Sequence, residues 1–340
     1  DGRPVDGITI DVDNYTVSKD TTINGNTTGS ALNWSWLGNK VITVENNANL
    51  TFNGIQLNSA TIKGNGNIIV KNNNGGIPGY VGGNIQANAL TLNKNYGNGI
   101  YLYEHDLTLD VEHLTINSTD NGIIQEVWGD KAHTIPLKVA STTTINNTQS
   151  ININSSGSWA VHNNSQAGVL NNIYMRSDKA GSVINLMGLN GVSHTSSGKT
   201  ILKADNVNIG SSQYYGVFAG SSGLLDITAV NDVVIKDREI EKGNYARDAA
   251  RAQNGTLVIT AQNGNIKLIG ESGVHTVGSG TATITAAQFN RILAADNTLH
   301  ATGGDILITG QNNTIGADAD VLSSRFDFEY GDGKAISPEN

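Results

Sequence analysis

Two stretches in the second half of the chain decide the fold: Leu-Asp-Ile-Thr-Ala-Val-Asn-Asp-Val-Val-Ile at 225–235 and Leu-Val-Ile-Thr-Ala-Gln-Asn-Gly-Asn-Ile-Lys-Leu-Ile-Gly at 257–270. Each contains two short runs in which apolar and polar residues alternate, as they do in a strand that buries one face. Asn, Asp, Gln or Gly residues separate the two runs, and Asn, Asp and Gly favour tight turns. The stretches therefore predict pairs of short strands joined by tight turns.

The same arrangement recurs over most of the chain, for example at 107–117 and 201–210. About seven or eight residues after the last apolar residue of the second run, a small residue precedes a β-branched one. These pairs are Gly99-Ile100, Gly122-Ile123, Ala160-Val161, Ser182-Val183, Gly216-Val217 and Gly273-Val274. The steps from Ile100 to Ile123 and from Val161 to Val183 predict a repeating coil of about 22–23 residues. Longer intervals elsewhere indicate loop insertions.

Three short strands in each coil are typical of a parallel β-solenoid, in which stacked coils bury one continuous core. At roughly 4.8 Å per coil, about twelve coils form a rod of roughly 55–60 Å. Asn side chains in successive coils are expected to form amide ladders. The predicted organisation is an N-terminal cap with the first coils at 1–40, the solenoid at 41–317 and a C-terminal edge at 318–340. An irregular pair of β-sandwiches is the alternative.

Two segments depart from this pattern and are predicted to be insertions that leave the rod. The segment at 237–253 carries much of the charge, and its part at 245–253 has a helix-forming composition. The segment at 285–296 is expected to be a short helix that Thr285 caps. Either segment could cover a face of the sheet or contact a partner.

The composition excludes several classes of protein. The 340 residues include no Cys, so neither a disulfide scaffold nor a Cys-based zinc site is possible. A net charge of -9 with 21 Lys and Arg residues is unfavourable for binding nucleic acid. No apolar run is long enough to cross a membrane as a helix.

The runs at 107–117, 201–210, 225–235 and 257–270 resemble the passenger region of Gram-negative autotransporters, which are type V secreted proteins. They also resemble, more loosely, filamentous-haemagglutinin-like adhesins. The likeness covers most of 40–317 and lies in the texture of the sequence, not in an invariant motif. It implies a single-stranded right-handed β-helix on the bacterial surface, anchored at the outer membrane or secreted.

The resemblance also implies a non-catalytic adhesin that binds a host or bacterial surface glycan or protein and uses no cofactor. Self-association of copies in aggregation or biofilm is a further expectation. Attachment to a membrane is expected only through a translocator that this fragment lacks.

The motifs of β-helical enzymes are almost absent from the chain. Ser118-Thr119-Asp120-Asn121-Gly122 partly matches one pectinase motif, but the Asp-Asp, Gly-His-Gly and Arg-Ile-Lys motifs do not occur. Neither Gly-Asp-Ser-Gly nor Gly-x-Ser-x-Gly occurs, and the His residues lack metal-ligand spacing. The sequence therefore predicts neither an enzyme nor a metal site. A polysaccharide-degrading or polysaccharide-binding β-helix is the alternative, and degradation would need a pair of facing carboxylates.

One column of side chains is the candidate binding strip. If the β-branched residue of each small-residue pair points inward, the next residue points outward. This column contains Tyr101, Ile124, His162, Ile184, Phe218 and His275. A mixed apolar and aromatic column of this kind is typical of a surface that binds a glycan or a protein. In the alternatives, the register is one residue off and these are core residues, or a loop covers them.

Two further features concern binding. Arg247 and Arg251 are candidate contacts from the charged segment at 237–253. An ice-binding solenoid would need a regular Thr-x-Thr column, whereas the Thr residues at 142–144 and 281–283 look isolated.

Overall fold

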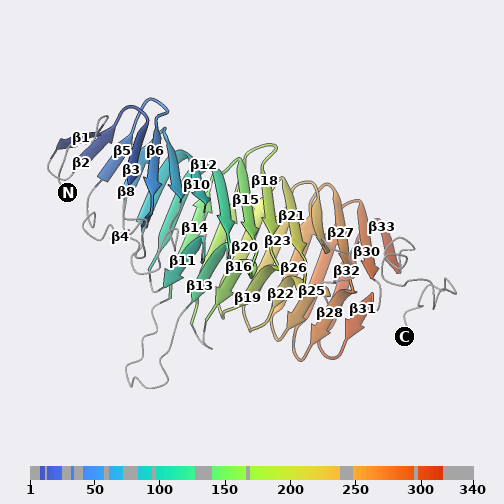
Figure 1. The fold of residues 1–340 in the computed structure, drawn as a ribbon. Coiled ribbons are helices and arrows are strands. Elements are labelled where there is room, and N and C mark those ends of the chain that lie inside the picture. Colours follow the sequence, from blue (N-terminus) through green and yellow to red (C-terminus); the bar gives the residue numbers. More distant parts are fainter. Residues whose placement is uncertain are drawn as a thin grey trace, which may run out of the picture.

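The computed structural model describes residues 8–11, 14–24, 32–33, 41–56, 61–71, 83–93, 97–103, 105–126, 140–165, 169–237, 248–294 and 298–316. Within these ranges every regular element is a β-strand, and there is no helix. The strands lie in layers along an elongated body that runs from β1 and β2 at one end to β31 and β33 at the other (Figure 1).

Most strands belong to two parallel stacks that are joined into one 23-stranded sheet. The first stack contains β2 (Asn14–Val17), β5 (Val41–Val44), β8 (Thr61–Gly64), β14 (Thr142–Asn146), β17 (Asn172–Arg176), β20 (Lys199–Ala204), β23 (Leu224–Ala229), β26 (Thr256–Ala261), β29 (Thr281–Ala286) and β32 (Asp305–Thr309). The second stack contains β3 (Thr21–Asn24), β6 (Asn49–Asn53), β9 (Asn67–Lys71), β15 (Ser150–Ser155), β18 (Val183–Met187), β21 (Asn206–Ser211), β24 (Val233–Asp237), β27 (Asn265–Gly270), β30 (Phe289–Ala294) and β33 (Asn312–Gly316). The long strands β10 (Gly83–Asn93) and β12 (Leu107–Ser118) run through both stacks.

A third stack forms a separate eight-stranded parallel sheet along another side of the body (Figure 1). It contains β11 (Ile100–Tyr103), β13 (Ile123–Glu126), β16 (Trp159–Asn164), β19 (Asn190–Thr195), β22 (Tyr215–Ala219), β25 (Asp248–Gln253), β28 (Ser272–Val277) and β31 (Leu299–Ala301). The short strands β4 (Leu32–Asn33) and β7 (Ile55–Gln56) pair with each other. β1 (Ile8–Asp11) pairs with β2 of the first stack, and this is the only antiparallel pair among the described strands.

This stacking is that of a parallel β-solenoid, because each strand pairs with its counterpart in the next coil. It rules out a pair of β-sandwiches for the described residues, since sandwiches are built from antiparallel sheets. The expected step of 23 residues is confirmed where Ile100 pairs with Ile123. Other coils are slightly longer: Asn93 and the hydrogen-bonded Asn117 are 24 positions apart, and Asn254 and Ser279 are 25 apart. The expected step from Val161 to Val183 is wrong, because Val183 lies in the second stack and Val161 pairs with Val192, 31 positions later.

Both predicted helices are wrong where the structure describes them. Residues 248–253 form β25, between β22 and β28, and residues 285–294 lie mostly in β29 and β30. Ala249, Ala250 and Ala252 are almost fully buried in β25. Stacking between two neighbouring strands and burial of these side chains outweigh the weak helix preference of the segment. Residues 238–247 and 317–340 lie outside the described residues.

A steric constraint explains why a small residue precedes the β-branched residue of each third-stack strand. A Cβ added to Gly122, Gly191 or Gly216 would collide with an isoleucine Cγ2 atom and a backbone carbonyl oxygen of the next coil. For Gly191 these atoms belong to Ile209 and Gly216. The small side chain therefore lets successive coils come into contact at this corner, and this explains the spacing in the sequence.

The expected amide ladders are confirmed on the second stack. Asn185 donates through Nδ2 to Oδ1 of Asn152 at 2.8 Å, and Asn208 donates in the same way to Asn185 at 2.9 Å. A second ladder step joins Asn117 to Asn93 at 2.8 Å. These bonds run parallel to the backbone bonds between coils, so they hold outward side chains in register.

Part of the interior is polar, which the sequence pattern did not indicate. Asn163 and His194 occupy paired inward positions of β16 and β19, and both are fully buried. Asn163 donates to Oγ1 of Thr200 at 3.0 Å, and Nδ1 of His194 lies 2.9 Å from the same oxygen. Burial lowers the pKa of His194 to about 4, although the backbone of Gly198 and Ser196 partly opposes the shift. The imidazole is therefore neutral inside the folded chain at neutral pH.

We predict that Gly191→Ala lowers the free energy of unfolding by about 1–3 kcal/mol, because the added methyl group must displace Ile209 or the next coil. Denaturant unfolding followed by circular dichroism measures this. Gly316→Ala is the control, since no atom lies within 4 Å of the Cβ it adds. Equal effects of the two substitutions would contradict the steric explanation.

We predict that burial of neutral His194 makes the fold less stable in acid. The unfolded chain takes up a proton on this residue below pH about 6.5, whereas the folded chain does so only below about 4. The contribution of about 3 kcal/mol is therefore complete above pH about 6.5 and is lost as the pH falls toward 4. Unfolding curves at pH 7 and pH 4.5 should show a smaller pH dependence for His194→Asn than for the original chain. The same pH dependence in both proteins would contradict the prediction.

Candidate functional site

The third stack brings most of the predicted strip into one column. In the observed register the column contains Tyr101, Ile124, His162, Ser193, Phe218, Arg251, His275 and His300. Arg251, a separate candidate in the sequence, thus lies between Phe218 and His275. Arg247 lies outside the described residues.

Ile184 does not belong to this column, so the register expected for it is wrong. It lies in β18 of the second stack, pairs with Ile151 and Val207, and is 1% exposed. The third-stack strand of its coil begins later, at Asn190, where Gly191-Val192 repeats the small and β-branched pair. That pair was the signal by which Ser193 could have been found.

The column is only partly open to solvent. Ile124 and Ser193 are buried, whereas Tyr101, His162, Phe218 and His275 are half-buried. Burial lowers the pKa of His162 to about 4, so this side chain is neutral at neutral pH. The half-buried residues Phe218, Arg251, His275 and His300 follow one another in the column, so its longest run of solvent-accessible side chains lies there.

An aromatic cluster surrounds Tyr215 at the start of β22. Its ring is stacked on Trp159 with centroids 6.1 Å apart and on Phe218 with centroids 5.0 Å apart. The guanidinium carbon of Arg251 lies 5.7 Å from the centroid of the same ring. Trp159 also touches His162, with ring centroids 5.5 Å apart. The cluster links strands of several coils and forms an apolar surface beside a cation.

A charged cluster adjoins these rings. The buried carboxylate of Asp248 accepts a bond from Nη1 of Arg251 at 3.3 Å, and Nδ1 of His275 lies 3.5 Å from the same oxygen. The rings of His275 and His300 stack with centroids 4.5 Å apart. Burial lowers the pKa of His275; Asp248 opposes this shift, whereas Arg251 and His300 add to it. The ion pair of Asp248 with Arg251 therefore puts opposite charges side by side next to these rings.

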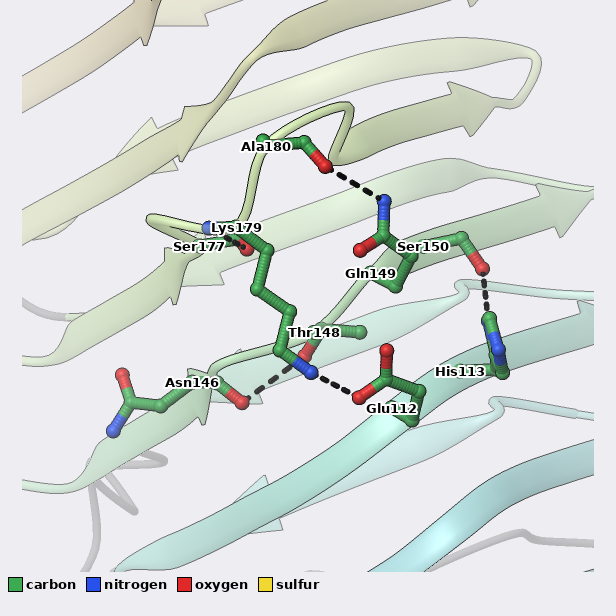
Figure 2. Close-up of polar contacts among 9 residues, drawn as sticks. All are labelled: Glu112, His113, Asn146, Thr148, Gln149, Ser150, Ser177, Lys179 and Ala180. Atoms are coloured by element: carbon green, nitrogen blue, oxygen red, sulfur yellow. Dashed lines mark hydrogen bonds and ion pairs between the residues drawn. The ribbon is translucent and has the colours of Figure 1, made fainter.

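A Ser–His pair occurs at the corner between the first and second stacks (Figure 2). Nδ1 of His113 lies 2.9 Å from Oγ of Ser150, the contact that an activated serine requires. The neighbouring carboxylate of Glu112 is paired with Lys179, whose side chain reaches across the intervening turn (Figure 2). Because Glu112 is engaged by Lys179, it does not orient His113 as a third catalytic group would. These polar contacts therefore link three coils at this corner.

A hollow of about 340 Å³ lies on the outward face of β12, β15 and β18. It is lined by Asn117, Asn152, Ile153, Asn154, Asn185 and Met187. No carboxylate is among these residues, so this hollow does not offer the facing pair that a hydrolytic polysaccharide site needs. Asp120, the other enzymatic candidate, is exposed in the turn after β12.

One Thr column is more regular than the sequence suggested. Thr228, Thr260, Thr285 and Thr309 are paired through four successive strands of the first stack. The adjoining outward column holds Asp226, Val258, Thr283 and Leu307. Because this second column is mixed, the face does not form the two-column Thr array that an ice-binding solenoid would need.

The described residues contain no group of three or more His, Cys, Asp or Glu residues placed to hold a metal ion. No helix long and apolar enough to cross a membrane occurs in them.

We predict that Asp248→Asn lowers the free energy of unfolding by about 2–3 kcal/mol, because it leaves the half-buried guanidinium of Arg251 without its ion pair. The same change should lower the pKa of His275 further, since Asp248 raises it. Chemical unfolding and NMR titration of the histidine ring measure the two effects. Asp178→Asn, which breaks the exposed pair with Lys203, is the control and should leave stability nearly unchanged. A rise in the His275 pKa would contradict the assigned role of Asp248.

No protein-family model, no curated protein sequence and no solved structure matches this chain.

Proposed function

We propose that this chain is the exposed passenger region of a Gram-negative autotransporter and acts as a surface adhesin. In this proposal the solenoid is a right-handed β-helix, exported by type V secretion and anchored at the outer membrane or released. It binds a host or bacterial surface glycan or protein without chemical change, and copies of it self-associate in aggregation or biofilm.

One observation carries the proposal: on the third stack, aromatic side chains beside the outward column and side chains of the column itself form one surface across several coils. Trp159 of β16, Phe218 of β22 and Arg251 of β25 all lie against the ring of Tyr215. A surface assembled from stacked coils is rigid, so an elongated ligand loses little binding free energy to ordering of the protein. The aromatic residues and the arginine are of the types enriched at binding hot spots.

The alternative, a polysaccharide-degrading β-helix, has less support. The Ser–His pair has its neighbouring carboxylate engaged by a lysine, and the lining of the hollow consists of amide and apolar side chains without a carboxylate. A binding role needs only the surface that the strip provides.

We predict that the chain is retained on at least one member of a panel of surface glycans and matrix proteins and leaves it uncleaved. Retention, new reducing ends and new peptide fragments are read from the same samples. Phe218→Ala should weaken retention about tenfold, because it removes a half-buried ring from the centre of the strip.

Tyr174→Ala is the matched control, since Tyr174 is a half-buried aromatic residue on the outward face of the first stack. It contacts Arg176 there, as Tyr215 contacts Arg251 in the strip. Equal loss of retention for both variants would place the binding surface elsewhere. Release of reducing ends or peptides would overturn the adhesin proposal in favour of an enzyme.

A further inference from the structure

We propose that the hollow on the second stack is a binding site for an uncharged saccharide. It is called here the asparagine groove and is defined by its lining residues Asn117, Asn152, Ile153, Asn154, Asn185 and Met187. It lies on a different stack from the aromatic strip, so it is a second site and does not depend on the proposed function.

The size and position of the asparagine groove fit a short carbohydrate segment. Its volume of about 340 Å³ lies at the lower end of the range of roughly 300–1,000 Å³ for small-molecule sites. It spans β12, β15 and β18, in which Asn117, Asn154 and Met187 are paired across the coils. Two steps of roughly 4.8 Å separate the outer strands, so the groove accommodates a short run of linked sugar rings.

The amides in the groove are an array with unused hydrogen-bonding capacity. The ladder along the stack ends here: Oδ1 of Asn152 accepts the bond from Asn185, and no described residue accepts the two N–H bonds of Asn152. Asn117 uses one N–H on Asn93, which leaves its Oδ1 available to a ligand. The exposed Asn154 makes no side-chain bond to any described residue, so its donors and acceptor are all available.

A hydroxyl group both donates and accepts, and a free carboxamide offers both complementary groups side by side. Regularly spaced hydroxyls on a sugar chain can therefore pair with Asn117, Asn152 and Asn154 at once. None of the lining side chains is ionisable. Phosphate, sulfate and carboxylate ligands would lose water without a charged partner, so the groove selects a neutral ligand.

Met187 provides the apolar part of the site. It is paired with Gly210 in the next coil, and a Cβ at 210 would lie 2.5 Å from both Cε and Sδ of Met187. The missing side chain at Gly210 thus gives the methionine room to lie along the wall of the stack. An adaptable thioether beside amides suits the C–H face of a sugar ring, which turns apolar atoms toward the protein while its hydroxyls bond at the rim.

The test uses the full chain and a set of neutral oligosaccharides built from glucose, galactose and mannose, with oligogalacturonate as the acidic probe. Binding is followed by isothermal calorimetry and by shifts of the Asn side-chain amide signals in NMR. We expect at least one neutral probe to bind and to shift the Asn152 and Asn154 amide signals. Asn154→Ala should weaken its binding about tenfold, equivalent to the loss of one or two hydrogen bonds.

Two control variants and one further test variant check that the saccharide binds in the groove. Asn312→Ala removes an exposed amide at the far end of the same stack and should leave binding unchanged. Gly210→Ala should weaken binding because it displaces Met187, and Phe218→Ala should not affect it because Phe218 lies in the strip. The proposal is overturned if no neutral probe binds at millimolar concentration, if oligogalacturonate binds equally well, or if Asn312→Ala and Asn154→Ala have the same effect. Loss of binding in Phe218→Ala alone would assign the saccharide to the strip and not to the groove.

Discussion

Every other feature of this protein depends on one constraint, that a single coil cannot bury its own apolar residues. The inward side chains of β23 and β24, such as Leu225, Ile227 and Ile235, are fully buried because coils on both sides cover them. Since hydrophobic burial contributes about 25 cal/mol per Å², repetition of this contact from coil to coil supplies the stability of the rod. The small residues at the third-strand corner follow from the same demand, because bulky side chains there would hold neighbouring coils apart.

Stacking also decides what faces outward. Each outward position repeats in the next coil, so side chains far apart in the sequence become neighbours along a column. The amides of Asn152, Asn185 and Asn208 form a ladder in this way. The rings of Trp159 and Tyr215 come into contact from β16 and β22, which lie on either side of β19 in the third stack. The strip and the asparagine groove are therefore products of register, and a shift of one residue in pairing would dismantle both.

In the interior, the alternation of polar and apolar residues in the sequence does not predict the position of every side chain. Asn163 and His194 occupy inward positions that a hydrophobic pattern would assign to the surface. Both hydrogen-bond to the hydroxyl of Thr200, whereas Oδ1 of Asn163 and Nε2 of His194 have no partner among the described residues. The bonds to Thr200 reduce the free-energy cost of burying these side chains, and this partner comes from a strand of a different stack. No local sequence pattern indicates such a partner.

The sequence by itself determined the repeated short strands, their alternation, the small residue before the third strand and most of the outward column, including Tyr101, His162, Phe218 and His275. These features are local, since they follow from a period of two within a strand and from steric limits at a corner. Only the tertiary structure decided that 248–253 and most of 285–294 are strands, that Ile184 is buried in the second stack and that Arg251 joins the strip beside Asp248. The physical reason is that pairing with the next coil, and not local propensity, sets the conformation and the register of each strand in a stack.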